Sequence, residues 1–105
     1  MRKVAILGIG QTKVDEQWDK SLREIGGEAA FLAMQDAGVD KVDALYVGNM
    51  LSSMVSGQNQ LGTFFGDWIG LWKQEAVKIE AACGSGAAAF RSALMAVASG
   101  DVESA

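Results

Sequence analysis

The sequence predicts an α/β protein with a mostly parallel sheet, and two kinds of spacing lead to that prediction. Apolar residues recur at helical spacing over residues 22–37 and again after residue 84. Residues 4–10, 43–48 and 76–82 instead show the continuous or alternating apolar patterns of strands. Strand and helix alternate along the chain with short turns between them, an order that favours a right-handed parallel crossover.

Bulk composition limits the classes of function. The chain has 105 residues, of which 50% are hydrophobic and 21% charged, as in one globular domain. Its net charge is -4 and it has no basic run, so we expect no nucleic-acid partner. Without an apolar run of about 20 residues or a secretory signal, we expect no membrane association and a cytoplasmic location. One cysteine and no histidine predict neither an internal disulfide nor a metal site.

The first element expected is a strand over residues 4–10. Its unbroken apolar run, Val-Ala-Ile-Leu-Gly-Ile-Gly, is typical of a strand covered on both faces. Gly8 and Gly10 suggest a dinucleotide-binding loop, but the third glycine of that motif is missing. The next helix also begins about ten residues too late, so we reject a nucleotide site.

The next helix has both of its ends marked in the sequence. Ser21 and Glu24 have the spacing of a capping box, and Gly38 is a typical stop. These signals predict an amphipathic helix over 22–37 that covers one face of the sheet. A strand over 43–48 follows.

The middle of the chain predicts a helix over 58–70 and an edge strand over 76–82. The helix carries a broad apolar stripe that packs in the core, contacts another subunit, or does both; its members are Leu61, Phe64, Phe65, Trp68, Ile69 and Trp72. In the strand, Val77 and Ile79 alternate with Lys78 and Glu80. Alternation suits a sheet edge, which needs cover or a partner.

Cys83 lies where this strand pattern gives way to a helix over 84–98, so we expect its thiol on the first turn of that helix. Unpaired N–H groups and the peptide dipoles there favour a thiolate, whereas burial among alanines favours the neutral thiol. Sequence leaves both possibilities open, together with a third in which Cys83 is a buried packing residue. Gly84 and Gly86 are poor helix formers and suggest that something approaches the backbone closely.

The helix after Cys83 is apolar around most of its circumference. Arg91 is its single charged residue between positions 84 and 98. A helix of this kind is buried on most sides. The few elements of this chain cannot surround it, so we expect exposed apolar surface that another domain or chain covers.

The run Ala82-Cys83-Gly84-Ser85-Gly86, followed by an alanine-rich helix, resembles the nucleophile motif of the thiolase family. It is similar above all to sterol-carrier-type and archaeal acetyl-CoA acetyltransferases. Those proteins usually have Cys-Ala-Ser-Gly-Gly, where this chain has Gly84 and Ala87. Residues 3–13, 42–49 and 97–100 share the resemblance, which therefore spans the chain.

The resemblance implies that residues 1–105 are the N-terminal segment of a thiolase N-terminal domain, an incomplete part of one βαβαβα half. The intact protein would have five layers, α-β-α-β-α, and would dimerise through the strand at 76–82. The missing remainder of the chain would complete the fold. Cys83 would be the catalytic nucleophile, with Gly84 and Ser85 in substrate binding.

The implied function is that of an acetyl-CoA C-acyltransferase in lipid metabolism that forms or cleaves 3-ketoacyl-CoA such as acetoacetyl-CoA. Its substrate is a coenzyme A thioester and it needs no cofactor. The family's second cysteine and its histidines lie later in the chain, so the fragment alone is expected to be inactive. Alternatives are a relative of ketoacyl synthase or hydroxymethylglutaryl-CoA synthase, and a non-catalytic thiolase-like scaffold or lipid-carrier partner.

Overall fold

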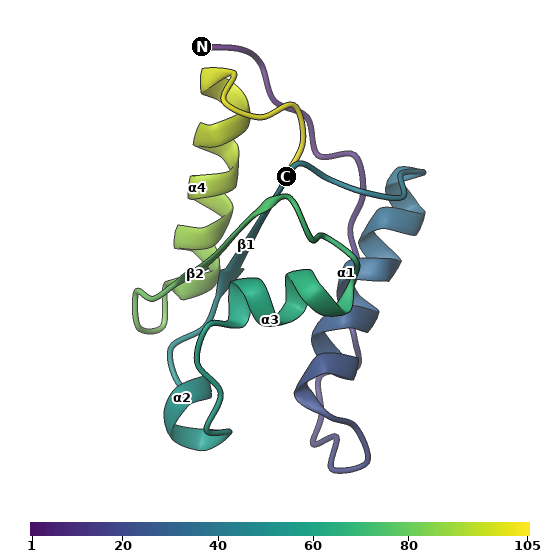
Figure 1. Ribbon diagram of the computed structural model, residues 1–105, viewed down its shortest axis with the longest axis vertical. Helices are drawn as coiled ribbons and strands as arrows, with labels where there is room; N and C mark the ends of the chain where they lie inside the picture. The colour runs from purple at the N-terminus through teal and green to yellow at the C-terminus, as the bar shows by residue number, and fades with distance from the viewer.

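Two parallel strands form the centre of the molecule (Figure 1). In a computed structural model, which describes residues 1–105, β1 spans Ala44–Gly48 and β2 spans Glu75–Ile79. Ala44 lies opposite Glu75, and Gly48 lies opposite Ile79. The α/β class with a parallel sheet, predicted from the sequence, is confirmed. The predicted parallel crossover from residues 4–10 to 43–48 is not formed, and the five-layer arrangement of an intact protein stays a prediction.

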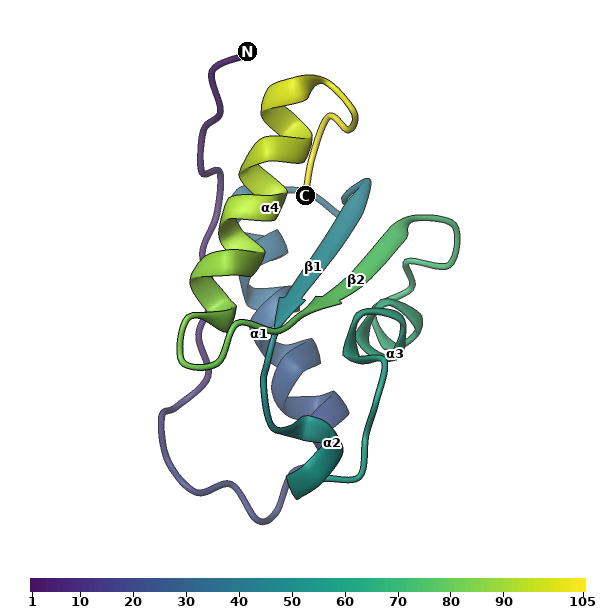
Figure 2. The same cartoon turned by 90° about the vertical axis from the view of Figure 1, so that its left-hand side faces the viewer.

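Helices cover both faces of this small sheet (Figure 2). α4, Ser85–Ser99, packs against β1 and β2 from one side, and α3, Leu61–Trp68, packs against them from the other. A single turn, α2, Ser52–Val55, lies between β1 and α3. The predicted helices at 58–70 and 84–98 are thus present. β2 ends at Ile79, three residues earlier than predicted, because a turn begins at Ala81.

α1, Leu22–Ala37, has the ends that its sequence predicts. The Ser21 hydroxyl accepts a bond from the Glu24 N–H at 3.2 Å, and the Glu24 carboxylate accepts one from the Ser21 N–H at 2.6 Å. These bonds favour the ionised carboxylate, so the pKa of Glu24 falls below its ordinary value of 4.5. Gly38 ends the helix in the left-handed conformation, with φ 70°.

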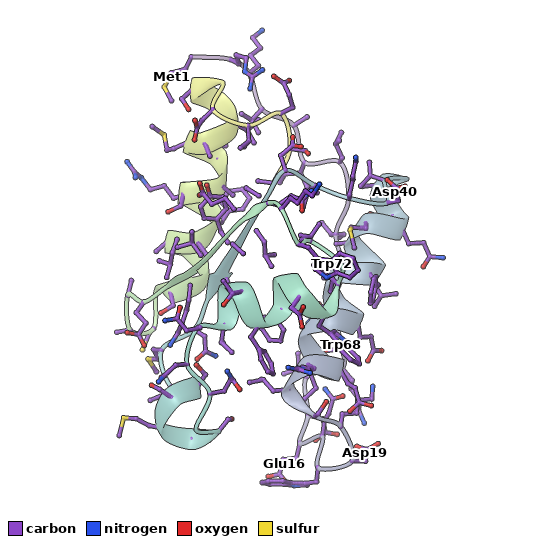
Figure 3. The ribbon with its side chains drawn as sticks, viewed as in Figure 1. Met1, Glu16, Asp19, Asp40, Trp68 and Trp72 are labelled. Carbon is purple, nitrogen blue, oxygen red and sulfur yellow. The ribbon has the colours of Figure 1, made fainter.

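α1 packs on α3, which corrects the prediction that it covers a face of the sheet. Gly27 is buried, and a Cβ on it would lie 2.6 Å from Cδ1 of Trp68. The Arg23 guanidinium lies 4.5 Å from the centre of the Phe64 ring. Figure 3 shows Trp68 where the two helices meet. The physical reason is that the two-stranded sheet is already covered by α3 and α4.

The apolar stripe around α3 serves the core only in part. Leu61 and Phe65 are buried, as the core interpretation predicts. Trp72, which follows the helix, is 80% exposed (Figure 3). Contact with another subunit, the second interpretation, stays a prediction.

The predicted strand at 4–10 is wrong for this chain. The segment pairs with neither β1 nor β2 and instead runs along α1 (Figure 1). Gly8 and Gly10 face that helix: a Cβ on Gly8 would lie 2.7 Å from the Ala37 Cβ. Ile6 and Ile9 are 69% and 74% exposed. A strand needs hydrogen bonds to a neighbouring strand, whereas this segment lies against α1, where the Ile9 N–H donates to the Asp36 carboxylate at 2.9 Å.

The molecule exposes more surface than a self-contained protein of its mass. Its accessible surface is 7116 Å², whereas about 5,600 Å² is expected for a folded monomer of this mass. α4 contributes to the difference, since Phe90, Leu94 and Met95 are exposed. The predicted bare apolar flank of this helix is confirmed. None of the helices combines the length and the apolar character needed to cross a bilayer.

Candidate functional site

A tight turn joins β2 to α4 and carries the only cysteine of the chain. The Gly84 N–H donates to the Ala81 carbonyl at 2.9 Å, and the Ser85 N–H donates to the Ala82 carbonyl at 3.2 Å. Ala82 has φ 47°, in the left-handed region that costs a non-glycine residue about 1–2 kcal/mol. Strain of this kind collects at functional sites, where the surrounding structure holds it in place.

Cys83 lies at the outer corner of this turn, and its position differs from the prediction. α4 begins at Ser85 with Gly84 as its cap, so Cys83 precedes the cap instead of lying on the first helical turn. The left-handed Ala82 bends the backbone, and the helix begins at Ser85, one residue later than predicted. The side chain is exposed within residues 1–105, so these residues do not bury Cys83, and its role stays a prediction.

Several backbone donors beside Cys83 are unused. The N–H groups of Cys83, Gly86 and Ala87 have no acceptor among the hydrogen bonds of the structure. The helix has no side-chain cap either. Unpaired donors at a helix start favour negative charge, whether on a thiolate or on a carbonyl oxygen that becomes negative during a reaction.

Gly84 and Gly86 differ in the space around them. A Cβ on Gly84 would lie 3.3 Å from the Ala81 carbonyl oxygen, a close but not prohibitive contact. A Cβ on Gly86 would meet nothing within 4 Å. The chain itself therefore does not require a glycine at 86, which leaves room over the helix start for another group. A role of Gly84 in substrate binding stays a prediction.

Ser85 is buried and uses its hydroxyl within the turn. Its Oγ accepts a bond from the Ala81 N–H at 2.9 Å and donates one to the Ala82 carbonyl at 2.7 Å. The predicted role of Ser85 in substrate binding stays a prediction. What the structure adds is a hydroxyl that links the residues on either side of the turn.

The end of β1 supports this turn, and sequence reasoning missed it. A Cβ on Gly48 would lie 2.7 Å from the Cα of Gly86, so only a glycine lets β1 approach α4 so closely. The Asn49 N–H donates to the Ile79 carbonyl at 3.2 Å, and the Asn49 carboxamide accepts the Ser52 N–H at 2.8 Å. The one signal in the sequence was a glycine at the end of an apolar strand.

A side-chain hydrogen bond also joins β1 and β2. The Tyr46 hydroxyl on β1 donates to the Glu75 carboxylate on β2 at 2.7 Å. This bond, aided by partial burial and the negative charge of Glu75, raises the pKa of Tyr46 to about 12. The link fixes the two strands at the end opposite Cys83.

Two hollows beside α1 are separate from the Cys83 turn, since Cys83 lines neither of them. No group of three or more His, Cys, Asp or Glu side chains is placed to hold a metal ion. The site is therefore one thiol with backbone donors, and the chain has no histidine to serve as its base.

The fold and this turn define a class of α/β proteins that present a cysteine between a strand and the helix that follows it. The family model for the thiolase N-terminal domain matches residues 4–105. The chain belongs to the thiolase family, as the sequence motif predicted.

Two curated relatives are archaeal proteins named acetyl-CoA acetyltransferase. The protein of Methanothermobacter thermautotrophicus is 45% identical over 102 residues, which are 95% of this chain and 27% of the relative. The protein of Methanocaldococcus jannaschii is 42% identical over 102 residues, or 95% of this chain and 26% of the relative. The chain thus spans about a quarter of the length of these relatives.

Proposed function

We propose that residues 1–105 are the nucleophile-bearing segment of an acetyl-CoA C-acyltransferase. The observation that carries the proposal is the placement of Cys83, exposed on a strained turn beside unused backbone N–H groups. Membership of the thiolase family and two relatives named acetyl-CoA acetyltransferase support the same reaction. The substrate is a coenzyme A thioester.

In the proposed reaction, the Cys83 sulfur attacks the thioester carbonyl carbon. A carbon–sulfur bond to Cys83 forms, the bond to the coenzyme A sulfur breaks, and the coenzyme A thiolate takes up the proton that the cysteine has lost. Backbone N–H groups at the turn are suited to stabilise the negative carbonyl oxygen during the attack. A second acetyl-CoA then loses a proton from its acetyl α-carbon to a base. That carbon bonds to the acyl carbonyl carbon as the carbon–sulfur bond to Cys83 breaks, and the Cys83 thiolate takes up a proton. The product is acetoacetyl-CoA, and thiolysis is the reverse.

Other parts of a longer protein are needed for carbon–carbon bond chemistry. This chain has no histidine and no second cysteine, so it lacks the usual bases for activating the thiol and the acetyl group. We therefore propose that residues 1–105 alone can accept an acyl group but cannot form or cleave acetoacetyl-CoA. The bare flank of α4 is the surface on which the remainder of a thiolase fold would pack.

A dimer is the proposed assembly, with β2 at its interface. β2 pairs only with β1, so its second edge is free to accept another strand. Val77 is 37% exposed on this strand. Pairing with the same strand of a second copy would remove both edges at once and would bring two Cys83 turns near one interface.

The test is cleavage of acetoacetyl-CoA by the complete translation product that contains residues 1–105. Cys83→Ser should lower turnover by a factor on the order of ten thousand or more, because a serine hydroxyl is a far weaker nucleophile than a cysteine thiol. A non-catalytic scaffold, the alternative from another class, would show no turnover in either protein. Residues 1–105 alone should show none, and turnover by a verified preparation of that segment would contradict the proposal.

A further inference from the structure

We propose that Ser85 is a positioning residue for Cys83, acting through its buried hydroxyl on the turn that aims the thiol. This inference rests on the proposed function, since it assumes that Cys83 accepts an acyl group. Ser85 itself touches neither substrate nor sulfur in this role. It fixes the backbone from which the sulfur projects.

The hydroxyl bonds span the strained residue of the turn. Ser85 Oγ accepts from the Ala81 N–H at 2.9 Å and donates to the Ala82 carbonyl at 2.7 Å, so it holds the chain on both sides of the left-handed Ala82. With 5% of its surface exposed, Ser85 is shielded from water that would compete for these bonds. The turn is thereby kept in one conformation.

Ser85 is in turn fixed to the sheet. It is the first residue of α4, which packs against β1, and Gly48 at the end of β1 approaches the backbone of Ser85 and Gly86 in direct contact. The hydroxyl therefore transmits the rigid position of β1 to the turn. Without it, only the backbone bonds from Gly84 and Ser85 would hold the turn.

Cys83 depends on this support because its own side chain is exposed and forms no hydrogen bond in the structure. The backbone fixes the direction of its Cα–Cβ bond, and rotation about χ1 then places the sulfur. Attack on a thioester requires the sulfur, the carbonyl carbon and the oxyanion donors to align, and a displacement of about 1 Å costs a rate factor of roughly 10². Alkylation by a small reagent needs only an accessible thiolate.

The experiment compares two reactions of Cys83 in the complete translation product. The first is acetylation by acetyl-CoA, in which a bond to the Cys83 sulfur forms as the bond to the coenzyme A sulfur breaks and its thiolate leaves with a proton. The second is alkylation by iodoacetamide. Both are followed by the mass of the peptide that contains Cys83, which separates it from any other thiol.

Ser85→Ala should slow acetylation by a factor of roughly 10 to 100 and leave alkylation within about threefold. Ser92→Ala is the matched control, since it removes another serine hydroxyl of α4, one that donates to the Ala88 carbonyl at 2.9 Å. It should leave both rates nearly unchanged. Ser85→Thr keeps a hydroxyl and should restore most of the acetylation rate.

The results separate this inference from the proposed function. Absence of an acetyl adduct on the wild-type Cys83 would refute the function. If the wild type is acetylated normally and Ser85→Ala is acetylated at the same rate, the positioning role of Ser85 is refuted and the proposed function stands. An equal loss of acetylation and alkylation in Ser85→Ala has the same meaning. If Ser85→Ala does not fold, the Thr variant decides: slow acetylation in a folded Ser85→Thr protein overturns the inference, and a rate near the wild type supports it.

Discussion

The starts of α1 and α4 differ in whether a side chain caps them. At α1 a side chain caps the helix: the Ser21 hydroxyl accepts the Glu24 N–H and the Glu24 carboxylate accepts the Ser21 N–H, while the N–H groups of Leu22 and Arg23 stay unused. At α4 no side chain caps the helix, and the N–H groups of Gly86 and Ala87 stay unused beside an exposed cysteine. We call the capped start of α1 closed and the uncapped start of α4 open. The cap stabilises the fold, whereas the unused donors of α4 lie beside an exposed thiol. The thiol, and not the number of unused donors, distinguishes the start of α4.

The largest effect on the free energy of unfolding is expected where the uncapped start of α4 contacts β1. Gly48→Ala should lower the free energy of unfolding by about 3 kcal/mol, because its Cβ would collide with the backbone of Ser85 and Gly86. Gly86→Ala, whose Cβ would meet nothing, should instead raise it by up to about 1 kcal/mol. Urea unfolding of both variants measures the difference. Equal effects would show that the close approach of β1 to α4 is not real.

The strained turn provides the second test. Ala82→Gly should raise the free energy of unfolding by about 1 kcal/mol, because glycine adopts a positive φ without steric cost. Ala82→Val should lower it by about 2 kcal/mol, since a β-branched residue fits that region poorly. Thermal unfolding of the pair checks the sign. A valine variant as stable as the glycine variant would contradict a left-handed Ala82.

Removing the Ser21 cap should lower the stability of the protein and leave the reactivity of Cys83 unchanged. Ser21→Ala is expected to lower the free energy of unfolding by about 1 kcal/mol through loss of the cap. It should leave the alkylation rate of Cys83 unchanged, because the two helix starts are built from separate residues. Chemical unfolding and thiol alkylation on the same samples test both statements. A change in thiol reactivity would show that the two ends are coupled.

The smallest effect is expected in acid, which should weaken the Ser21–Glu24 cap of α1 and leave the start of α4 unchanged. Because folding depresses the pKa of Glu24 below 4.5, its contribution is present above pH 4.5 and is lost as pH falls through the folded value. The protection of the Ser21 amide, measured relative to its intrinsic exchange rate at each pH, should then fall, and Glu24→Gln should remove that dependence. Acid-induced exchange that also appears first at Ala88, a donor in the first turn of α4, would contradict the distinction.

Features set by neighbouring residues were predictable from the sequence, and those set by distant contacts were not. Ser21, Glu24 and Gly38 identified α1 because capping is local. Residues 4–10 have the composition of a strand, but Gly8 and Gly10 pack against α1 and the segment pairs with neither strand, a contact that the local sequence does not reveal. The offset of Cys83 from the helix was hidden because an alanine in the left-handed region has no signature in sequence.

The contacts that support the Cys83 turn could not be predicted from the sequence for the same reason. Gly48 is required by a contact with a helix that begins 37 residues later, and the sequence shows only a glycine at a strand end. The burial of Ser85 and the use of its hydroxyl in the turn likewise depend on how α4 lies on β1. Motif and chemistry were predictable, and the geometry that holds the thiol was not.

The most direct test of the open helix start is the mass of the Cys83 peptide after brief incubation of the complete translation product with acetyl-CoA. We predict one added acetyl group on that peptide, removed by free coenzyme A and absent from the Cys83→Ser variant. An unmodified Cys83 in a folded wild-type protein, or the same adduct in the serine variant, would contradict the account.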